Sequence, residues 1–222
     1  MSDTDGKSEV KGEMELVALQ QLTDGKSEVK DYLDHDHYWI RRKSLKLFGG
    51  SFHVYDSKDN LVLFSSQKAF KLKEDIRVFS DESMNEERLT IKARSIIDFG
   101  AAYDVVDGAS GEKLGAFRRK GLKSILKDTW EMLDNNDNPI AKLAEDSGCL
   151  ALVRRMGGIG GLIPQSFYLE IDGKRAASYR QRFNPFISKM DVNLEKGARD
   201  ILDPRMALAA GILLVAIEGR QG

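Results

Sequence analysis

The stretch that decides the fold is Asp203–Ile217, DPRMALAAGILLVAI, close to the end of the chain. Asp203 is a good N-cap and Pro204 a favoured first helical residue, so we expect a helix to begin here. The twelve residues from Met206 onward have no polar side chain. As a helix they would span roughly 18 Å, well short of the roughly 30 Å hydrocarbon core of a bilayer. A helix that is apolar on every side and lies outside lipid must be surrounded by protein.

The sequence before this helix predicts repeated β-hairpins. An alternating apolar and polar stretch ends in an aspartate five times, at Asp56, Asp81, Asp107, Asp134 and Asp172. The first four are 25, 26 and 27 residues apart, and the fifth follows after 38. Asp caps its own backbone and tolerates left-handed φ angles, which makes it typical of hairpin turns. The period fits a hairpin with its connection and is too short for a βαβ unit.

These hairpins, with strands expected near 38–48 and 190–194, amount to about a dozen antiparallel strands. That many strands form a sandwich or close on themselves, because closure removes exposed edges. A helix inside a large barrel would be covered on all sides and would fill the lumen. We therefore predict a mainly β fold for residues 37–222: a closed antiparallel β-barrel of about twelve strands around a central hydrophobic C-terminal α-helix.

Composition excludes several protein classes. The chain has 222 residues, 41% hydrophobic and 31% charged, which suits a globular protein with a sizeable core. Its one cysteine, Cys149, rules out an intramolecular disulfide framework and a cysteine-based zinc site. No apolar run at the N-terminus resembles a signal peptide, so we expect a cytoplasmic protein.

Residues 1–36 differ from the remainder in charge. They hold ten Asp and Glu against four Lys, whereas residues 37–222 hold 30 basic and 25 acidic residues. The segment TDGKSEVK occurs at 4–11 and again, unchanged, at 23–30. The repeat is either a duplicated docking motif or a slipped duplication, and the polar composition favours the second interpretation. We expect residues 1–36 to form a disordered acidic tail.

Two basic clusters are candidate binding sites for anionic lipid. The denser one contains Arg118, Arg119, Lys120 and Lys123, and the other contains Arg41, Arg42 and Lys43. In a strand, Arg118 and Lys120 share one face and Arg119 points the other way. Two cations on one face could clamp a phosphate, and the two clusters would form one head-group site if they adjoined in the barrel. The alternative is that both are solvated strand faces.

Other motifs give weaker signals. Three oxygen-bearing residues precede the helix, Asp191, Asn193 and Glu195, but the Gly and Glu of a calcium-binding EF-hand loop are replaced by Lys196 and Leu202. An ordinary turn is therefore favoured over a calcium site. The glycine-rich segment 157–162 lacks nucleotide-binding spacing, so we expect a loop with an apolar shoulder that could dip into a membrane. No grouping of residues predicts catalysis, and no cofactor is expected.

The chain also resembles a known family. Four segments carry the resemblance: Tyr38–Lys43, Ala69–Leu72, Leu114–Lys120 and the helix after Asp203. They are similar to the tubby C-terminal-like superfamily, in the branch of LURP-one-related and phospholipid scramblase-related proteins, over about residues 37–221. The resemblance implies a closed barrel around a C-terminal helix. It also implies phosphoinositide binding through basic residues, as in tubby domains, or lipid transport with a calcium-responsive segment, as in scramblases.

From these patterns we expect a non-enzymatic domain that associates with anionic phospholipid at membrane surfaces, with no nucleic-acid partner. One alternative is a scramblase-type lipid transporter whose terminal helix lies in the bilayer. Another is a structural or protein-interaction barrel without a ligand. Fold alone does not decide among them, because one fold supports several functions.

Overall fold

The computed structural model describes residues 32–44, 50–67, 75–94, 102–120, 129–146, 164–182 and 187–217. The chain divides into two units, Met1–His35 and Asp36–Gly222. All the elements below belong to the second unit. The expected tail and its repeat, the glycine-rich segment 157–162 and Lys123 lie largely or wholly outside the described residues.

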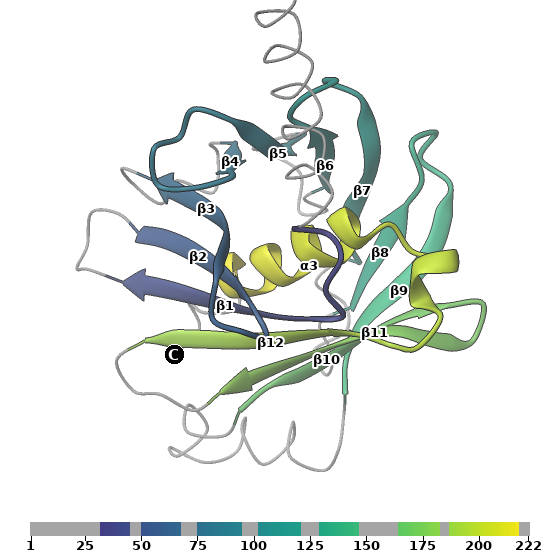
Figure 1. The fold of residues 1–222 in the computed structure, drawn as a ribbon. Helices are drawn as coiled ribbons and strands as arrows, with labels where there is room; N and C mark the ends of the chain where they lie inside the picture. The colour runs from purple at the N-terminus through teal and green to yellow at the C-terminus, as the bar shows by residue number, and fades with distance from the viewer. Residues whose placement is uncertain are drawn as a thin grey trace, which may run out of the picture. The chain divides into compact units, whose positions relative to one another are not determined.

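Twelve antiparallel strands of the described residues form one closed barrel (Figure 1). Each strand pairs with its sequence neighbours, and β1 pairs with β12 to close the ring. The prediction of about twelve strands in a closed barrel is confirmed. The strands are β1 (His37–Ser44), β2 (Gly50–Asp56), β3 (Leu61–Gln67), β4 (Ile76–Phe79), β5 (Glu87–Ala93), β6 (Ala102–Asp107), β7 (Lys113–Arg119), β8 (Thr129–Leu133), β9 (Pro139–Glu145), β10 (Ser166–Ile171), β11 (Lys174–Arg182) and β12 (Ser188–Leu194).

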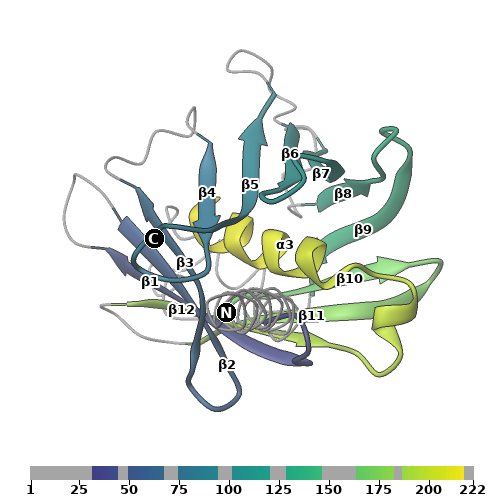
Figure 2. The same cartoon turned by 45° about the horizontal axis from the view of Figure 1, so that its top comes forward.

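Helix α3 (Pro204–Ile217) runs inside this ring of strands (Figure 2). Every side chain from Met206 to Ala216 is buried, and they pack on the inward residues of the strands. The hydroxyl of Tyr179 on β11 donates a hydrogen bond to the Ala207 carbonyl, at 3.1 Å. The central apolar helix is therefore confirmed, and its all-round apolar sequence follows from being enclosed by protein on every side.

The start of α3 is fixed by side chains. Asp203 accepts a hydrogen bond from the backbone N–H of Arg205 at 2.8 Å, as predicted for the N-cap. The Arg205 guanidinium binds Asp203 and also donates to Asp107 at the β6–β7 turn, with Nη1 and Oδ2 2.6 Å apart. This bridge ties the first turn of the helix to the barrel wall.

The predicted hairpin aspartates form the turns. Asp56 and Asp134 each accept hydrogen bonds from the backbone N–H groups two and four residues later, at 2.8–2.9 Å. The third residue after each has a left-handed φ, 64° at Asp59 and 69° at Asp137. Asp172 and Gly173 make a two-residue turn with φ of 49° and 75°.

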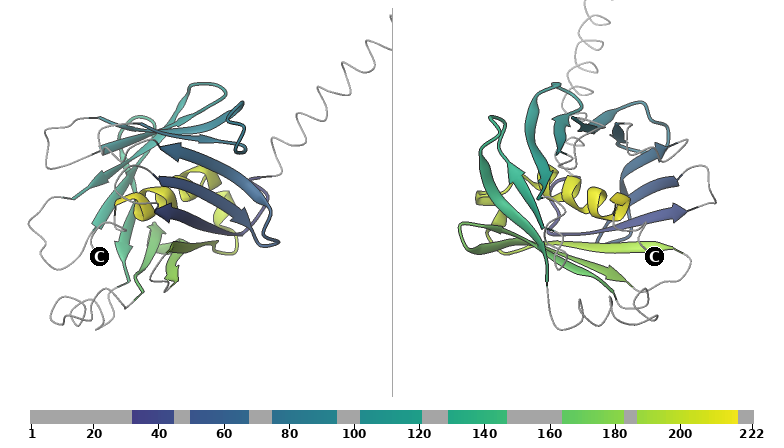
Figure 3. Two further views of the ribbon diagram at one scale, coloured as in Figure 1. Left: turned by 90° about the vertical axis from the view of Figure 1, so that its left-hand side faces the viewer. Right: turned by 180° about the vertical axis from the view of Figure 1, so that it is seen from behind.

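Strand order gives the barrel two different ends. The turns β2–β3, β4–β5, β6–β7, β8–β9 and β10–β11 follow even strands, so they lie at the end where β12 leads into α3. We call this the turn end. The connections that follow odd strands, such as β1–β2 and β7–β8, belong to the opposite end, which we call the connection end. In both views of Figure 3, α3 lies among the strands between these two ends.

Candidate lipid-binding surface

The predicted cluster on β7 is organised around an internal carboxylate. Arg118 and Lys120 both form ion pairs with Glu131 of β8, and Arg118 Nη2 lies 2.7 Å from Glu131 Oε2. Hydrogen bonds from Lys120 and Arg118 hold the pKa of Glu131 below its usual range. The two cations thus share one face, as predicted, but they clamp a carboxylate of the protein.

Arg119 points to the other face of β7, as the alternation of a strand predicts. Its guanidinium lies over the ring of Trp130, with Cζ 5.9 Å from the ring centroid, and Trp130 is buried in the core. Arg119 therefore does not join Arg118 and Lys120 in an exposed anion site.

The position of Arg42 differs from the expectation that it joins Arg41 and Lys43 in an exposed head-group site. Its side chain is 8% exposed and points into the barrel, on the same face of β1 as Tyr38 and Ile40. Nη1 donates to the carbonyl of Val215 at 3.2 Å, and the guanidinium lies over Phe52. A cation here is favourable because the C-terminus of a helix is the negative end of its dipole. Arg42 therefore belongs to the core rather than to a head-group site.

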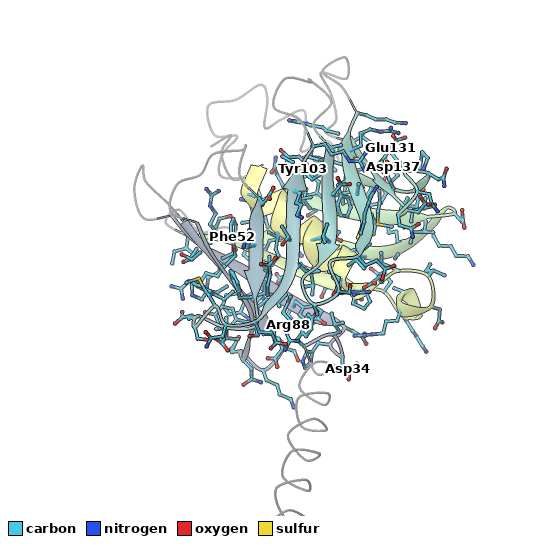
Figure 4. All side chains as sticks on the ribbon, turned by 90° about the horizontal axis from the view of Figure 1, so that it is seen from above. Asp34, Phe52, Arg88, Tyr103, Glu131 and Asp137 are labelled. Atoms are coloured by element: carbon cyan, nitrogen blue, oxygen red, sulfur yellow. The ribbon has the colours of Figure 1, made fainter. Side chains whose placement is uncertain are left out.

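The two predicted clusters do not adjoin. β1 and β7 are six places apart in the barrel order in either direction. Figure 4 shows Phe52, which contacts Arg42, and Glu131, which binds Arg118, on different sides of the barrel. The single combined site expected from the sequence is not formed. Lys43 lies opposite Ser51 in the β1–β2 pairing, and Lys123 lies outside the described residues.

A different arrangement appears where β1 closes the barrel against β12. The strand register places four residues in one row on consecutive strands: Arg182 of β11, Lys189 of β12, Arg41 of β1 and His53 of β2. Neighbouring strands are only about 4.8 Å apart. Three permanent cations therefore lie next to each other on the outer face, where like charges directly opposite one another are destabilising.

Carboxylates neutralise only part of this charge. Asp191 makes a two-point contact with Arg182, with Nε and Oδ2 2.7 Å apart, and this contact raises the pKa of Arg182. Arg41 and Lys189 have no ion-pair partner among the described residues. The same holds for Arg180, an exposed residue of β11 that faces outward beside Asp191.

Trp39 lies at the centre of this region. Lys189 Nζ is 5.3 Å and Arg182 Cζ 5.8 Å from its ring centroid. The indole stacks on Tyr55 at 4.3 Å and donates its N–H to Asp59 at 2.9 Å. We call the set Trp39, Arg41, Arg180, Arg182 and Lys189 the Trp39 surface.

Two polar atoms beneath this row are buried without a hydrogen-bond partner among the described residues, Arg41 Nε and His53 Nδ1. His53 is otherwise held by Glu82, with Nε2 and Oε1 2.9 Å apart. Such atoms carry a desolvation cost that folding does not recover. Part of the Trp39 surface is thus held in an arrangement that is not optimal for stability.

The calcium candidates lie at the edge of this region. The carboxylate of Asp191 is held by Arg182 and by His37, whose Nε2 is 3.3 Å away. Within the described ranges no group of three or more His, Cys, Asp or Glu side chains is placed to hold a metal ion. The sequence favoured an ordinary turn over a calcium site at Asp191, Asn193 and Glu195, and that interpretation stays a prediction. Of the helices in the described part of the chain, none has the length and apolar character to cross a membrane.

Comparisons with known proteins show which family part of the chain resembles. The LURP-one-related family model matches residues 61–156, which confirms the resemblance predicted from the sequence. No curated protein matches the chain. The X-ray structure of a protein from Arabidopsis thaliana is similar, with a TM-score of 0.47 and 12% identity over 86% of this chain and 96% of that one.

Proposed function

For this chain, which matches the LURP-one-related family model over residues 61–156, we propose a non-enzymatic role in binding anionic phospholipid at a membrane surface. The binding surface is the Trp39 surface. The observation that carries the proposal is the row of adjacent cations on β11, β12 and β1, of which Lys189 and Arg41 have no ion-pair partner in the described residues.

Electrostatics supports this assignment. Like charges opposite one another on paired strands weaken the sheet, so the row is not explained by stability. Near a negatively charged bilayer each such cation contributes about 1 kcal/mol of attraction. Arg41, Arg180 and Lys189 are available for this because no carboxylate holds them in the described residues.

The chemistry of the neighbouring groups fits a lipid head group. An arginine can bind phosphate oxygens with two parallel hydrogen bonds. Trp39 is part-exposed and offers an apolar ring with cations over its face, and tryptophan favours the boundary between head groups and hydrocarbon. The β7 cluster fits less well, because Glu131 already occupies Arg118 and Lys120.

Vesicle flotation tests the proposal directly. The full chain should float with vesicles that contain anionic phospholipid at low salt, and should not float with vesicles of zwitterionic lipid alone. Binding should weaken as salt rises, because the Debye length falls from about 10 Å at 0.1 M to about 3 Å at 1 M. A protein that stays in solution with anionic vesicles at low salt would contradict the proposal and favour a structural or protein-interaction barrel.

Lipid transport with α3 in the bilayer is a separate prediction. It would require α3 to leave the barrel, where Met206–Ala216 are buried and supply much of the core. No feature of the residues that the structure describes favours this step. A lipid-flip assay on reconstituted protein tests it, and transport at a rate above that of protein-free vesicles would support it.

A further inference from the structure

The row of basic residues across β11, β12, β1 and β2 has a carboxylate at each of its two outer members. Arg182, at one end of the row, is paired with Asp191, with Nε and Oδ2 2.7 Å apart. His53, at the other end, is paired with Glu82, with Nε2 and Oε1 2.9 Å apart. The two inner members have no such carboxylate among the residues that the structure describes. The uncompensated charge of the row is therefore concentrated at its centre.

The inner members are Lys189 of β12 and Arg41 of β1, which lie directly opposite each other in the strand register. Side chains in such a pair start from Cβ atoms about 4.5–5.5 Å apart, so two permanent positive charges are held side by side. The buried atoms without a hydrogen-bond partner include Nε of Arg41 but neither of its Nη atoms, and no hydrogen bond within the described ranges holds those two atoms. The terminal edge of the guanidinium is therefore open to a ligand.

Lys189 is positioned by an aromatic ring. Its Nζ lies 5.3 Å from the ring centroid of Trp39. The Trp39 indole is itself fixed, because it stacks on Tyr55 and donates its N–H to Asp59. A cation over a ring face keeps N–H donors for a further acceptor. Lys189 is thus placed beside Arg41 with its charge and donors available.

From this arrangement we propose that Arg41 and Lys189 form a discrete site for one phosphomonoester group, which bridges β1 and β12. The Arg41 fork binds two of the phosphate oxygens and the Lys189 ammonium binds the third. The chemistry recognised is a terminal phosphate, which either a lipid head group or a small soluble molecule can supply. For the lipid source the inference rests on the proposed function, and it adds which kind of head group the Trp39 surface selects.

Charge and oxygen number distinguish this group from a phosphodiester. A phosphomonoester carries a charge of about −1.5 to −2 at pH 7 and has three strong acceptor oxygens. A phosphodiester carries one negative charge and has two free oxygens, so it neutralises only one of the two cations. Because like charges directly opposite each other destabilise paired strands, the dianion relieves a repulsion that a monoanion relieves only in part.

Vesicle partition at matched surface charge tests the site. One set of vesicles contains phosphatidate, which ends in a phosphomonoester, and the other contains phosphatidylglycerol, a phosphodiester, at mole fractions that give both sets the same zeta potential. Wild type should bind the phosphatidate vesicles several-fold more tightly. Arg41→Lys keeps the charge but removes the fork, so it should lose this preference and still bind both sets. Arg180→Lys, at an exposed residue of β11 on the Trp39 surface, is the matched control and should keep the preference.

Equal binding of wild type to the two sets, or a preference that both variants lose equally, would overturn the phosphomonoester site and leave the proposed function intact. The comparison of the two sets needs wild type alone, so it stands even if Arg41→Lys fails to fold.

Calorimetric titration with glycerol 3-phosphate, with dimethyl phosphate as the diester control, tests the soluble source. Binding of glycerol 3-phosphate that Arg41→Lys weakens several-fold would support the site without a membrane. If the chain binds glycerol 3-phosphate but neither set of vesicles, the proposed function is wrong and the site stands. If it binds neither the vesicles nor glycerol 3-phosphate, both proposals are wrong.

Discussion

Gly211 lies where α3 packs closely against the barrel wall. A Cβ added there would lie 2.8 Å from Cδ1 of Ile40 and 2.9 Å from Cγ2 of Val192. The wall side chains of β1 and β12 therefore fill the space that a larger residue would need. The sequence indicates an apolar helix here, but it gives no sign of which helix face meets which strand.

We predict that Gly211→Val lowers the free energy of unfolding by about 1–3 kcal/mol through overpacking, despite the better helix propensity of most residues over glycine. Chemical denaturation measures the change. Gly173→Ala is an instructive comparison, because a Cβ there has nothing within 4 Å and any cost would come from its left-handed φ of 75°. A Gly211→Val protein as stable as wild type would show that the helix can move away from the wall.

Asp137 joins the β8–β9 turn to the outer face of the barrel. It binds Arg94 and Lys113, with the Lys113 Nζ 2.6 Å from Oδ1. Hydrogen bonds from Arg94 and then Lys113 lower the pKa of Asp137 to about 2, from an ordinary value of 3.8. The stabilisation is therefore present above the ordinary pKa and is lost as the pH falls toward 2.

We accordingly expect Asp137→Asn to be less stable than wild type near pH 6, and the difference in stability to be clearly smaller near pH 2.5. Asn tolerates the left-handed φ of 69°, so the substitution removes charge with little change in the turn. Thermal unfolding at both pH values measures the difference. Asp172→Asn is the matched control, and a gap between wild type and Asp137→Asn that does not change with pH would contradict the account.

Arg42 shows that alternation along a strand can predict the direction of a side chain but not its distant contacts. Residues 38, 40 and 42 share a face of β1, and the two apolar members could have indicated that Arg42 points inward. Its acceptor, the carbonyl of Val215, is 173 residues away and could not be inferred. The Trp39 surface was missed for a similar reason, since the β1–β12 pairing joins residues about 150 positions apart.

Among the elements, the hairpins and α3 were predictable because each has a local signal. The turn aspartates cap their own backbones, and α3 has both an N-cap and an unbroken apolar run. Closure of the barrel was also predictable, because a closed sheet has no edge strand with unpaired backbone groups. Neither argument fixes the registers, which depend on bulges such as the one between Val54 and Tyr55.

At the scale of the helix, we predict that a chain truncated before Met206 does not fold cooperatively. The barrel would lose its core, and α3 is covered by the strands along its length. Leu208→Ala, at a fully buried position, should cost about 2–5 kcal/mol of unfolding free energy and keep the fold. A truncated protein that remains soluble and melts in a single sharp transition would refute the role of α3 as core.

The hairpin turns allow a second test at this scale. Asp134 accepts two backbone hydrogen bonds and a third from the side chain of Asn138, at 2.9 Å. We expect Asp134→Ala to lower stability by about 0.5–2 kcal/mol, as is typical for removal of a side-chain cap. Asn135→Ala, at an exposed neighbouring position, should change little. Equal effects of the two substitutions in urea denaturation would contradict the capping role.

For the whole molecule, the account attributes membrane attraction to the placement of charge rather than to its total. The net charge of the chain is −1, which alone predicts no attraction to an anionic surface. The Trp39 surface concentrates cations, while the described hairpin turns concentrate carboxylates. Two double variants that change the net charge equally distinguish an effect of charge placement from an effect of total charge.

The most direct measurement is the partition of wild type, Arg41→Glu/Lys189→Glu and Lys174→Glu/Lys196→Glu onto anionic vesicles at low salt. Lys174 and Lys196 are exposed at the turn end, so their reversal is the matched control. We predict that the first double variant binds at least about tenfold more weakly than wild type, from two lost contacts of about 1 kcal/mol each. The control should lose much less. Equal losses in both variants, or no loss at Arg41 and Lys189, would contradict the claim that the Trp39 surface binds the membrane.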